Sequence, residues 1–306
     1  MGVASAEPSS DPWQVHHLSA TLPGTLPSHM DAALEALLDG VIDYAGLFPP
    51  AALSMEDAVV EFLDHLDGDE ALLVNRFVCP ASRLGELSEH LDTDAEFAVT
   101  VIGSGLDQLE QDGGAMAAFT ERWEDQIVIE GYETRAGQDP VATLRAIRPF
   151  TNLDCYVEVP LGDSLSDWLA ELAKSELVAA KLRTGGLTAD SYPTPEQLAG
   201  FVAECLDLNL AFKLTAGLHH PVRRLDPETG GMMHGFLNVL IATALAEQHD
   251  LNRREIALIL REEDPRAFEV TATHVGWRGE MAGLPAIDSM RTLFSGFGSC
   301  SVDEPV

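Results

Sequence analysis

The chain has 306 residues, of which 46% are hydrophobic, and 50 acidic residues against 18 basic ones give a formal net charge of −32. A charge of this sign repels nucleic acid phosphates and anionic lipids, so we expect neither nucleic acid nor membrane as a partner. Because the acids are spread along a chain of ordinary hydrophobic content, a disordered acidic protein is excluded, and a halophilic protein with an acidic surface screened by concentrated salt is indicated.

The cysteines and the N-terminal residues indicate a soluble cytoplasmic protein. Cys79, Cys155, Cys205 and Cys300 form no CxxC pair, so neither a structural zinc site nor a disulfide framework is expected. No signal peptide or membrane span is recognisable. Residues 1–27 are rich in Pro, Ser and Gly, and we expect them to be a flexible segment before a single domain over residues 28–306.

Short apolar stretches of strand length alternate with helical patterns along the rest of the chain. Ser54 caps a helix with acids in its first turn, and residues 81–91 form a further helical pattern. Thr194, Pro195 and Gln197 have the spacing of a capping box with proline at the first helical position. The predicted strands are residues 41–44, 72–78, 97–102, 126–130, 153–159, 177–182, 210–214 and 268–274.

This rhythm predicts an α/β protein with a (β/α)8 TIM barrel, and a doubly wound open sheet is the alternative. Residues 294–301, which are small and rich in glycine, are expected to form a flexible C-terminal loop whose backbone N–H groups could hold an anion.

Only three lysines are present, and two of them occupy matching contexts. Lys181 and Lys213 each follow an apolar run, and each is followed by a polar residue two positions on and then by glycine. An isolated ammonium is costly to bury, and arginine cannot become a neutral amine at working pH. Lysines that face each other across the sixth and seventh strands would lower each other's pKa, and a neutral lysine is a nucleophile for carbonyl carbon.

In a barrel of this kind the site lies at the C-terminal ends of the strands. Residues two apart on a strand share a face, so Lys181 lies with Arg183, and Lys213 lies with Thr215. Arg183 could hold an anionic substrate group through its planar fork, or pair with a carboxylate. The remaining residues expected at these ends are Asp43, Arg76, Glu130, Glu158 and Thr184, with His219, His220 and His234 in the segment after the seventh strand.

Residues 181–185 (Lys-Leu-Arg-Thr-Gly) and 213–217 (Lys-Leu-Thr-Ala-Gly), with a Thr-Pro-Glu helix start between them, resemble class I aldolases of the deoxyribose-phosphate aldolase type. The resemblance covers roughly residues 177–220. It implies a Schiff base on Lys181, tuning of that lysine by Lys213, and no cofactor. Arg183 stands where that family has a small residue, and His219-His220-Pro221 stands where it has a phosphate-binding turn. The resemblance therefore does not imply that the substrate is a sugar or carries a phosphate.

The expected activity is therefore that of a lyase that cleaves or forms a carbon–carbon bond in a small carbonyl compound. Glu130, Glu158 or a histidine would move protons, and the protein is expected to be a homo-oligomer. One alternative is a metal-dependent lyase, isomerase or hydrolase with a divalent metal on His219, His220, His234 and Asp43 or Glu158. Another is a non-catalytic barrel that binds a small acid, in which each lysine simply pairs with a neighbouring carboxylate.

Overall fold

A closed barrel of eight parallel strands forms the centre of the computed structural model, which describes residues 32–92, 95–123 and 126–302. The strand order is β1-β13-β7-β6-β5-β4-β3-β2, and β1 closes the sheet by pairing with both β13 and β2. The predicted (β/α)8 barrel is thus confirmed, and the open sheet is excluded. The segment 1–27, for which flexibility was expected, lies outside the described residues.

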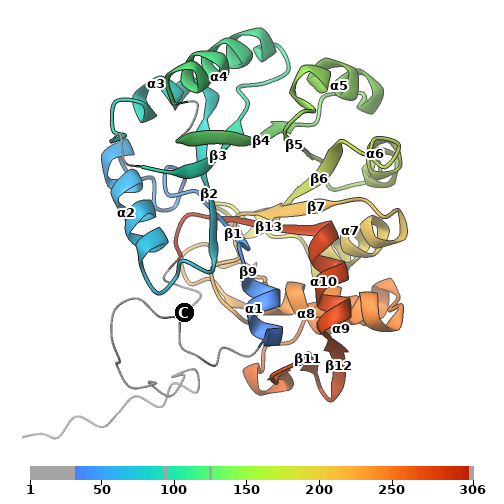
Figure 1. Cartoon of the computed structure of the whole chain (residues 1–306). Coiled ribbons are helices and arrows are strands. Elements are labelled where there is room, and N and C mark those ends of the chain that lie inside the picture. Colours follow the sequence, from blue (N-terminus) through green and yellow to red (C-terminus); the bar gives the residue numbers. More distant parts are fainter. Residues whose placement is uncertain (1–31, 93–94, 124–125, 303–306) are drawn as a thin grey trace, which may run out of the picture. The chain divides into compact units, whose positions relative to one another are not determined.

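Helices surround the barrel, as Figure 1 shows in a view onto the N-terminal ends of the strands. The barrel strands are β1 (Ile42–Tyr44), β2 (Val74–Pro80), β3 (Phe97–Ile102), β4 (Ile127–Arg135), β5 (Asp154–Glu158), β6 (Val178–Arg183), β7 (Phe212–Thr215) and β13 (Phe294–Ser299). The helices are α1 (Ala32–Leu38), α2 (Met55–Asp67), α3 (Leu84–Leu87), α4 (Leu109–Trp123), α5 (Pro140–Ile147), α6 (Leu165–Leu172), α7 (Pro195–Asp207), α8 (Phe236–His249), α9 (Arg253–Leu260) and α10 (Leu284–Leu293).

Side-chain caps fix two of these helices where the sequence predicts them. Ser54 Oγ accepts a hydrogen bond from the Asp57 backbone N–H at 3.1 Å and so begins α2. Thr194 and Gln197 form a reciprocal capping box at the start of α7, with Pro195 at the first helical position. Each cap satisfies backbone N–H groups that have no partner within the helix.

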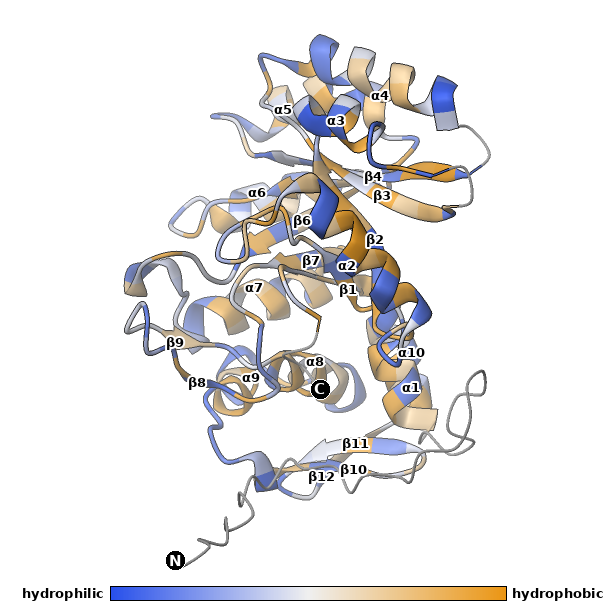
Figure 2. Ribbon diagram, turned by 90° about the vertical axis from the view of Figure 1, so that its left-hand side faces the viewer, coloured by the Kyte–Doolittle hydropathy of each residue, from blue (hydrophilic) through white to orange (hydrophobic). Residues whose placement is uncertain are grey.

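The core lies between the outward faces of the strands and the apolar faces of the helices (Figure 2). Phe62 of α2 packs on Phe77 of β2 and Phe97 of β3, with ring centroids 5.3 and 5.1 Å apart. On the opposite side, the rings of Phe212 of β7 and Phe201 of α7 pack together with their centroids 5.6 Å apart. Because these residues take the outward positions, the alternate positions of the same strands face the inside of the barrel.

The eighth barrel strand is not the predicted one. Residues 268–274 include β10 (Phe268–Val270), which belongs to a separate antiparallel sheet with β11 (His274–Trp277) and β12 (Glu280–Gly283). The eighth strand is instead β13, so the expectation of a flexible loop over residues 294–301 was also wrong for 294–299. Gly296 explains how this segment fits, since its φ is +139° and a Cβ there would lie 2.4 Å from the Val41 carbonyl oxygen.

A short hairpin of β8 (Arg224–Leu225) and β9 (Met232–Met233) follows β7 and marks the C-terminal end of the barrel, opposite α1 and α10 (Figure 2). Within the three described ranges, no helix is long and apolar enough to cross a membrane.

Candidate active site

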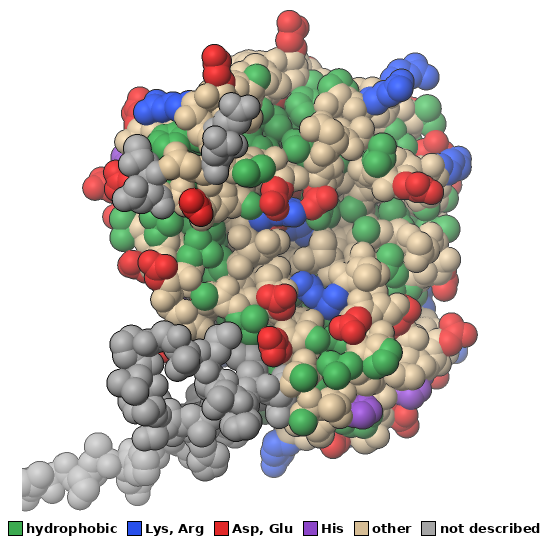
Figure 3. All heavy atoms as spheres, in the orientation of Figure 1, with side chains coloured by type: hydrophobic (Ala, Val, Ile, Leu, Met, Phe, Trp, Pro, Cys, Tyr) green, Lys and Arg blue, Asp and Glu red, His purple; other side chains and the backbone are tan. Residues whose placement is uncertain are grey.

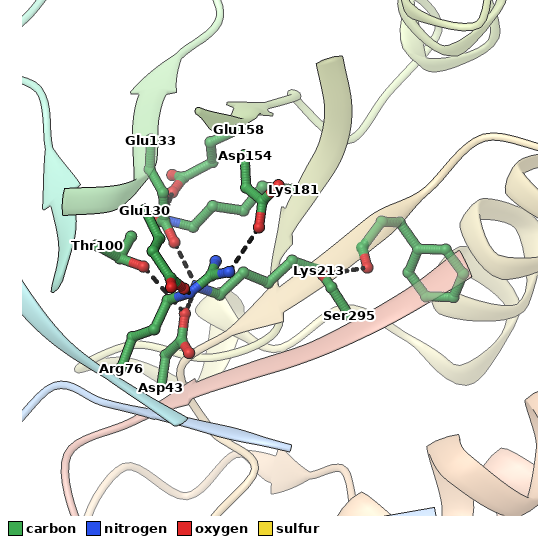
Figure 4. A network of polar contacts seen from close by, with 11 residues as sticks. Asp43, Arg76, Thr100, Glu130, Glu133, Asp154, Glu158, Lys181, Lys213 and Ser295 are labelled. Atoms are coloured by element: carbon green, nitrogen blue, oxygen red, sulfur yellow. Dashed lines mark hydrogen bonds and ion pairs between the residues drawn. The ribbon is translucent and has the colours of Figure 1, made fainter. Parts of the chain in front are cut away.

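A line of alternating carboxylates and lysines runs through the inside of the barrel (Figure 4). Lys213 Nζ donates to Asp43 and, at 2.5 Å, to Glu133 Oε1. Lys181 Nζ donates to the other oxygen of Glu133 and lies 3.2 Å from Glu158 Oε2. We call Asp43, Lys213, Glu133, Lys181 and Glu158 the lysine–carboxylate network.

The strand register places the two lysines as predicted. Lys181 of β6 and Lys213 of β7 are direct partners across the two strands, and Glu158 of β5 is the partner of Lys181 on the other side. The three side chains therefore face the inside of the barrel at neighbouring positions.

A β-bulge brings Glu133, the centre of the network, onto the same face. Val99 of β3 pairs with Ile129 of β4, but Thr100 pairs with Gly131, so Glu130 is an extra residue. The bulge shifts the alternation by one, and Glu133 turns inward while Tyr132 turns outward. Gly131 permits the close approach, because a Cβ there would lie 2.6 Å from Thr100 Oγ1.

Charge pairing dominates the electrostatics of the network. Burial alone would lower the pKa of Lys213, but the carboxylates of Asp43 and Glu133 outweigh it and raise that pKa above its ordinary value. Burial alone would raise the pKa of Glu133, but Lys181 and Lys213 hold it at about 2. The expectation that each lysine lowers the pKa of the other is therefore wrong for Lys213, because the intervening carboxylates outweigh the like charge.

Exposure increases along the network towards the C-terminal ends of the strands. Lys213 is 2% exposed and Lys181 is 5% exposed, whereas the side chain of Glu158 is 15% exposed and that of Arg183 is 48% exposed. Arg183 Nε donates to Glu158 Oε1 at 3.3 Å. Burial would raise the pKa of Glu158, but Lys181 and Arg183 lower it overall. Solvent thus reaches the network at Glu158, beside Arg183.

Two predicted site residues lie at the opposite end of the barrel. Arg76 donates from Nε to Glu130 at 2.9 Å and from Nη2 to Asp154 at 2.6 Å. These residues lie near the N-terminal ends of their strands, because β2 continues to Pro80 and β4 continues to Arg135. Figure 3 views these ends and shows acidic side chains beside a basic one near the middle of the face. Glu130 is therefore paired with Arg76 and does not contact either network lysine.

The two predicted threonines, Thr184 and Thr215, differ in how deeply they are buried. Thr184 is fully buried, and its hydroxyl contacts the carbonyl oxygens of Thr215 and Ala216 at 3.2 and 2.5 Å. It therefore joins the loops after β6 and β7 and has a structural role. Thr215 is half-buried, lies opposite Gly298 of β13 and belongs to the same inward face as Lys213.

The predicted histidines lie in two different settings. His234 is buried, its Nε2 bonds to the Pro193 carbonyl oxygen at 2.7 Å, and burial lowers its pKa to about 4. His219 and His220 are half-buried in the segment between β7 and β8. Among the residues that the structure describes, no group of three or more His, Cys, Asp and Glu side chains is arranged to hold a metal ion.

Sequence reasoning missed Glu133 and Arg135, because the fourth strand was predicted to end at residue 130. The signal that could have extended it is the presence of Tyr132 and Thr134, an aromatic and a β-branched residue at alternate positions beyond residue 130. Arg135 is exposed at the C-terminal end of β4 and is the register partner of Glu158.

Comparisons of the chain with family models, with curated proteins and with solved structures found no match.

Proposed function

We propose that this protein is a lyase that cleaves or forms a carbon–carbon bond in a small carbonyl compound through an imine on Lys181. The observation that carries the proposal is the placement of Lys181 and Lys213 as buried register partners joined by Glu133. A lysine amine held away from bulk water attacks carbonyl carbon once it has lost its proton. The C-terminal end of a (β/α)8 barrel is also where enzymes of this fold carry their active sites.

Lys181 is better placed than Lys213 to be the nucleophile. Lys213 lies between two carboxylates that raise its pKa, and it is the more deeply buried of the two. Lys181 borders Glu158 and thus the accessible end of the network. The same division of roles is implied by the resemblance to aldolases of the deoxyribose-phosphate aldolase type.

Lys181, Glu158, Lys213 and Glu133 each have a role in the reaction. Glu158, 3.2 Å from Lys181 Nζ, takes the ammonium proton, and the free amine attacks the carbonyl carbon. Glu158 gives this proton to the carbinolamine oxygen, which leaves as water, so that a protonated imine remains. Glu158 then takes the proton of the substrate hydroxyl on the carbon beyond the bond that breaks, and this carbon leaves as an aldehyde or ketone. The protonated imine accepts the electron pair of the broken carbon–carbon bond and becomes an enamine. Glu158 returns a proton to the enamine carbon, and water hydrolyses the imine. Lys213 keeps its charge between Asp43 and Glu133, while Glu133 accepts hydrogen bonds from both lysines and positions them.

The proposal is tested by proton exchange, which requires only the enamine and not the second substrate. Wild-type protein in D2O is incubated with acetaldehyde, acetone and pyruvate, and loss of the protons next to the carbonyl group is followed by NMR. Lys181→Arg keeps the positive charge but cannot form an imine, and Lys174→Arg is the matched control, since Lys174 is exposed and paired with Glu171. We expect exchange with at least one compound in wild type and in the control, and none in Lys181→Arg. Equal exchange in Lys181→Arg, or none in any protein, contradicts the proposal.

A further inference from the structure

Two arginines flank the accessible end of the lysine–carboxylate network. Arg135 ends β4 and Arg183 ends β6, and both belong to the inward-facing positions, two residues beyond Glu133 and Lys181 respectively. Between them lies Glu158 of β5, which is the register partner of Arg135 and of Lys181. The three strand ends thus present two guanidinium groups on either side of one carboxylate.

Most of the donor capacity of these two arginines is unused. Arg183 contacts Glu158 only through Nε, and its side chain is 48% exposed. Arg135 is exposed, and within residues 32–92, 95–123 and 126–302 no hydrogen bond or ion pair engages its guanidinium. A guanidinium presents five N–H donors in a planar fork that matches a carboxylate.

The network and its two flanking arginines carry more basic than acidic side chains, unlike the chain as a whole. Lys181, Lys213, Arg135 and Arg183 stand against the carboxylates of Asp43, Glu133 and Glu158, whereas the chain carries a formal charge of −32. A small anion is therefore repelled by the general surface and attracted at the strand ends where carbonyl chemistry is proposed.

We infer that Arg135 and Arg183 together bind the carboxylate of a short oxo acid, with its carbonyl carbon at Lys181. The position of Glu158 indicates how far apart Lys181 and Arg183 are. One oxygen of its carboxylate lies 3.2 Å from Lys181 Nζ and the other lies 3.3 Å from Arg183 Nε. A single carboxylate therefore spans the gap between the nucleophile and Arg183. Because Arg183 is already paired with Glu158, Arg135 supplies a second guanidinium group for the carboxylate of the substrate. The substrate thus carries its anionic group within one or two bonds of the reacting carbon.

This inference rests on the proposed function, because it places the reacting carbon of the substrate at Lys181. The test separates the carboxylate site from the imine by comparing carbonyl compounds with and without a carboxylate. Wild-type protein is reduced with borohydride in the presence of glyoxylate, pyruvate, acetoacetate, acetaldehyde or glyceraldehyde 3-phosphate, and the trapping rates are compared. We expect the oxo acids to be trapped faster than acetaldehyde, and Arg135→Gln or Arg183→Gln to reduce that preference about tenfold or more. Arg145→Gln, which removes an exposed arginine of α5, is the control and leaves the preference unchanged.

The outcomes are distinct. Trapping of acetaldehyde and oxo acids at equal rates, unaffected by either arginine variant, overturns the inference and leaves the imine intact. A preference for glyceraldehyde 3-phosphate that depends on both arginines also overturns it, in favour of a phosphate. If nothing is trapped, calorimetric binding of the oxo acids to wild type that is lost in Arg135→Gln and Arg183→Gln supports the anion site without the imine, and absence of binding overturns it.

Discussion

Replacing Glu133 by Gln removes the charge on which both buried lysines depend. Glu133 accepts hydrogen bonds from Lys181 and Lys213, and all three side chains are almost fully buried. Glutamine keeps the shape, but it can accept from only one lysine well and turns its amide donors towards the other. Breaking a buried pair by removing one partner costs about 3–5 kcal/mol. Asp43 and Glu158 remain as partners of Lys213 and Lys181, so we expect a cost at the lower end of that range.

Proton linkage gives a similar value for the free energy of unfolding that depends on the charge of Glu133. The pKa of Glu133 falls from its ordinary 4.5 to about 2 in the folded protein, which corresponds to about 3 kcal/mol of stability at neutral pH. Because the folded pKa is the lower one, this stability is fully present above pH 4.5 and is lost as the pH falls towards 2. We therefore expect Glu133→Gln to unfold about 3 kcal/mol more easily at pH 7 and to lose less stability than wild type below pH 4.5.

Equilibrium denaturation at pH 7 and across the acid range measures both effects. Glu171→Gln is the matched control, because Glu171 pairs with the exposed Lys174, and surface pairs contribute between 0 and about 1 kcal/mol. A Glu133→Gln protein as stable as the control at pH 7 would refute the argument that charge pairing holds the network together.

Three further predictions concern pH, backbone geometry and salt. Burial lowers the pKa of His234 to about 4, so wild type should lose about 2 kcal/mol between pH 7 and pH 5, as the unfolded chain takes up the proton. His234→Gln, which keeps an N–H donor for Pro193, should lose less, and equal losses in denaturation titrations would contradict this. Gly296→Ala should destabilise the protein by about 3 kcal/mol through its positive φ and the contact with Val41, whereas Gly114→Ala in α4, with open space around it, should be neutral or slightly stabilising. Equal denaturation midpoints for these two variants would show that β13 tolerates a side chain at that position. Raising KCl from 0.1 to 2 M should raise the thermal midpoint, because screening weakens the self-repulsion of a chain with net charge −32, and a midpoint independent of salt would contradict this.

The barrel and the facing lysines could be predicted because both depend on local patterns. Seven apolar runs of strand length identified seven of the eight barrel strands, and the alternation within two of them placed Lys181 and Lys213 on the inner face. Their register as direct partners then followed from the adjacency of the sixth and seventh strands.

The missed features depend on contacts between distant segments. The bulge at Glu130 is defined by the pairing of β4 with β3, so no local pattern shows that Glu133 turns inward. Glycine is unfavourable in strands, which made residues 294–299 resemble a loop. Their pairing with β7 and β1 outweighs that propensity, and Gly296 is required by the proximity of Val41.

The presence of only three lysines makes the central claim directly testable. Wild-type protein is incubated with the carbonyl compound that exchanges its protons, reduced with borohydride, digested, and analysed by mass spectrometry for adducts on Lys174, Lys181 and Lys213. We predict a single adduct on Lys181, absent from Lys181→Arg. An adduct confined to Lys213 would reverse the assigned roles, and the absence of any lysine adduct would contradict the imine mechanism.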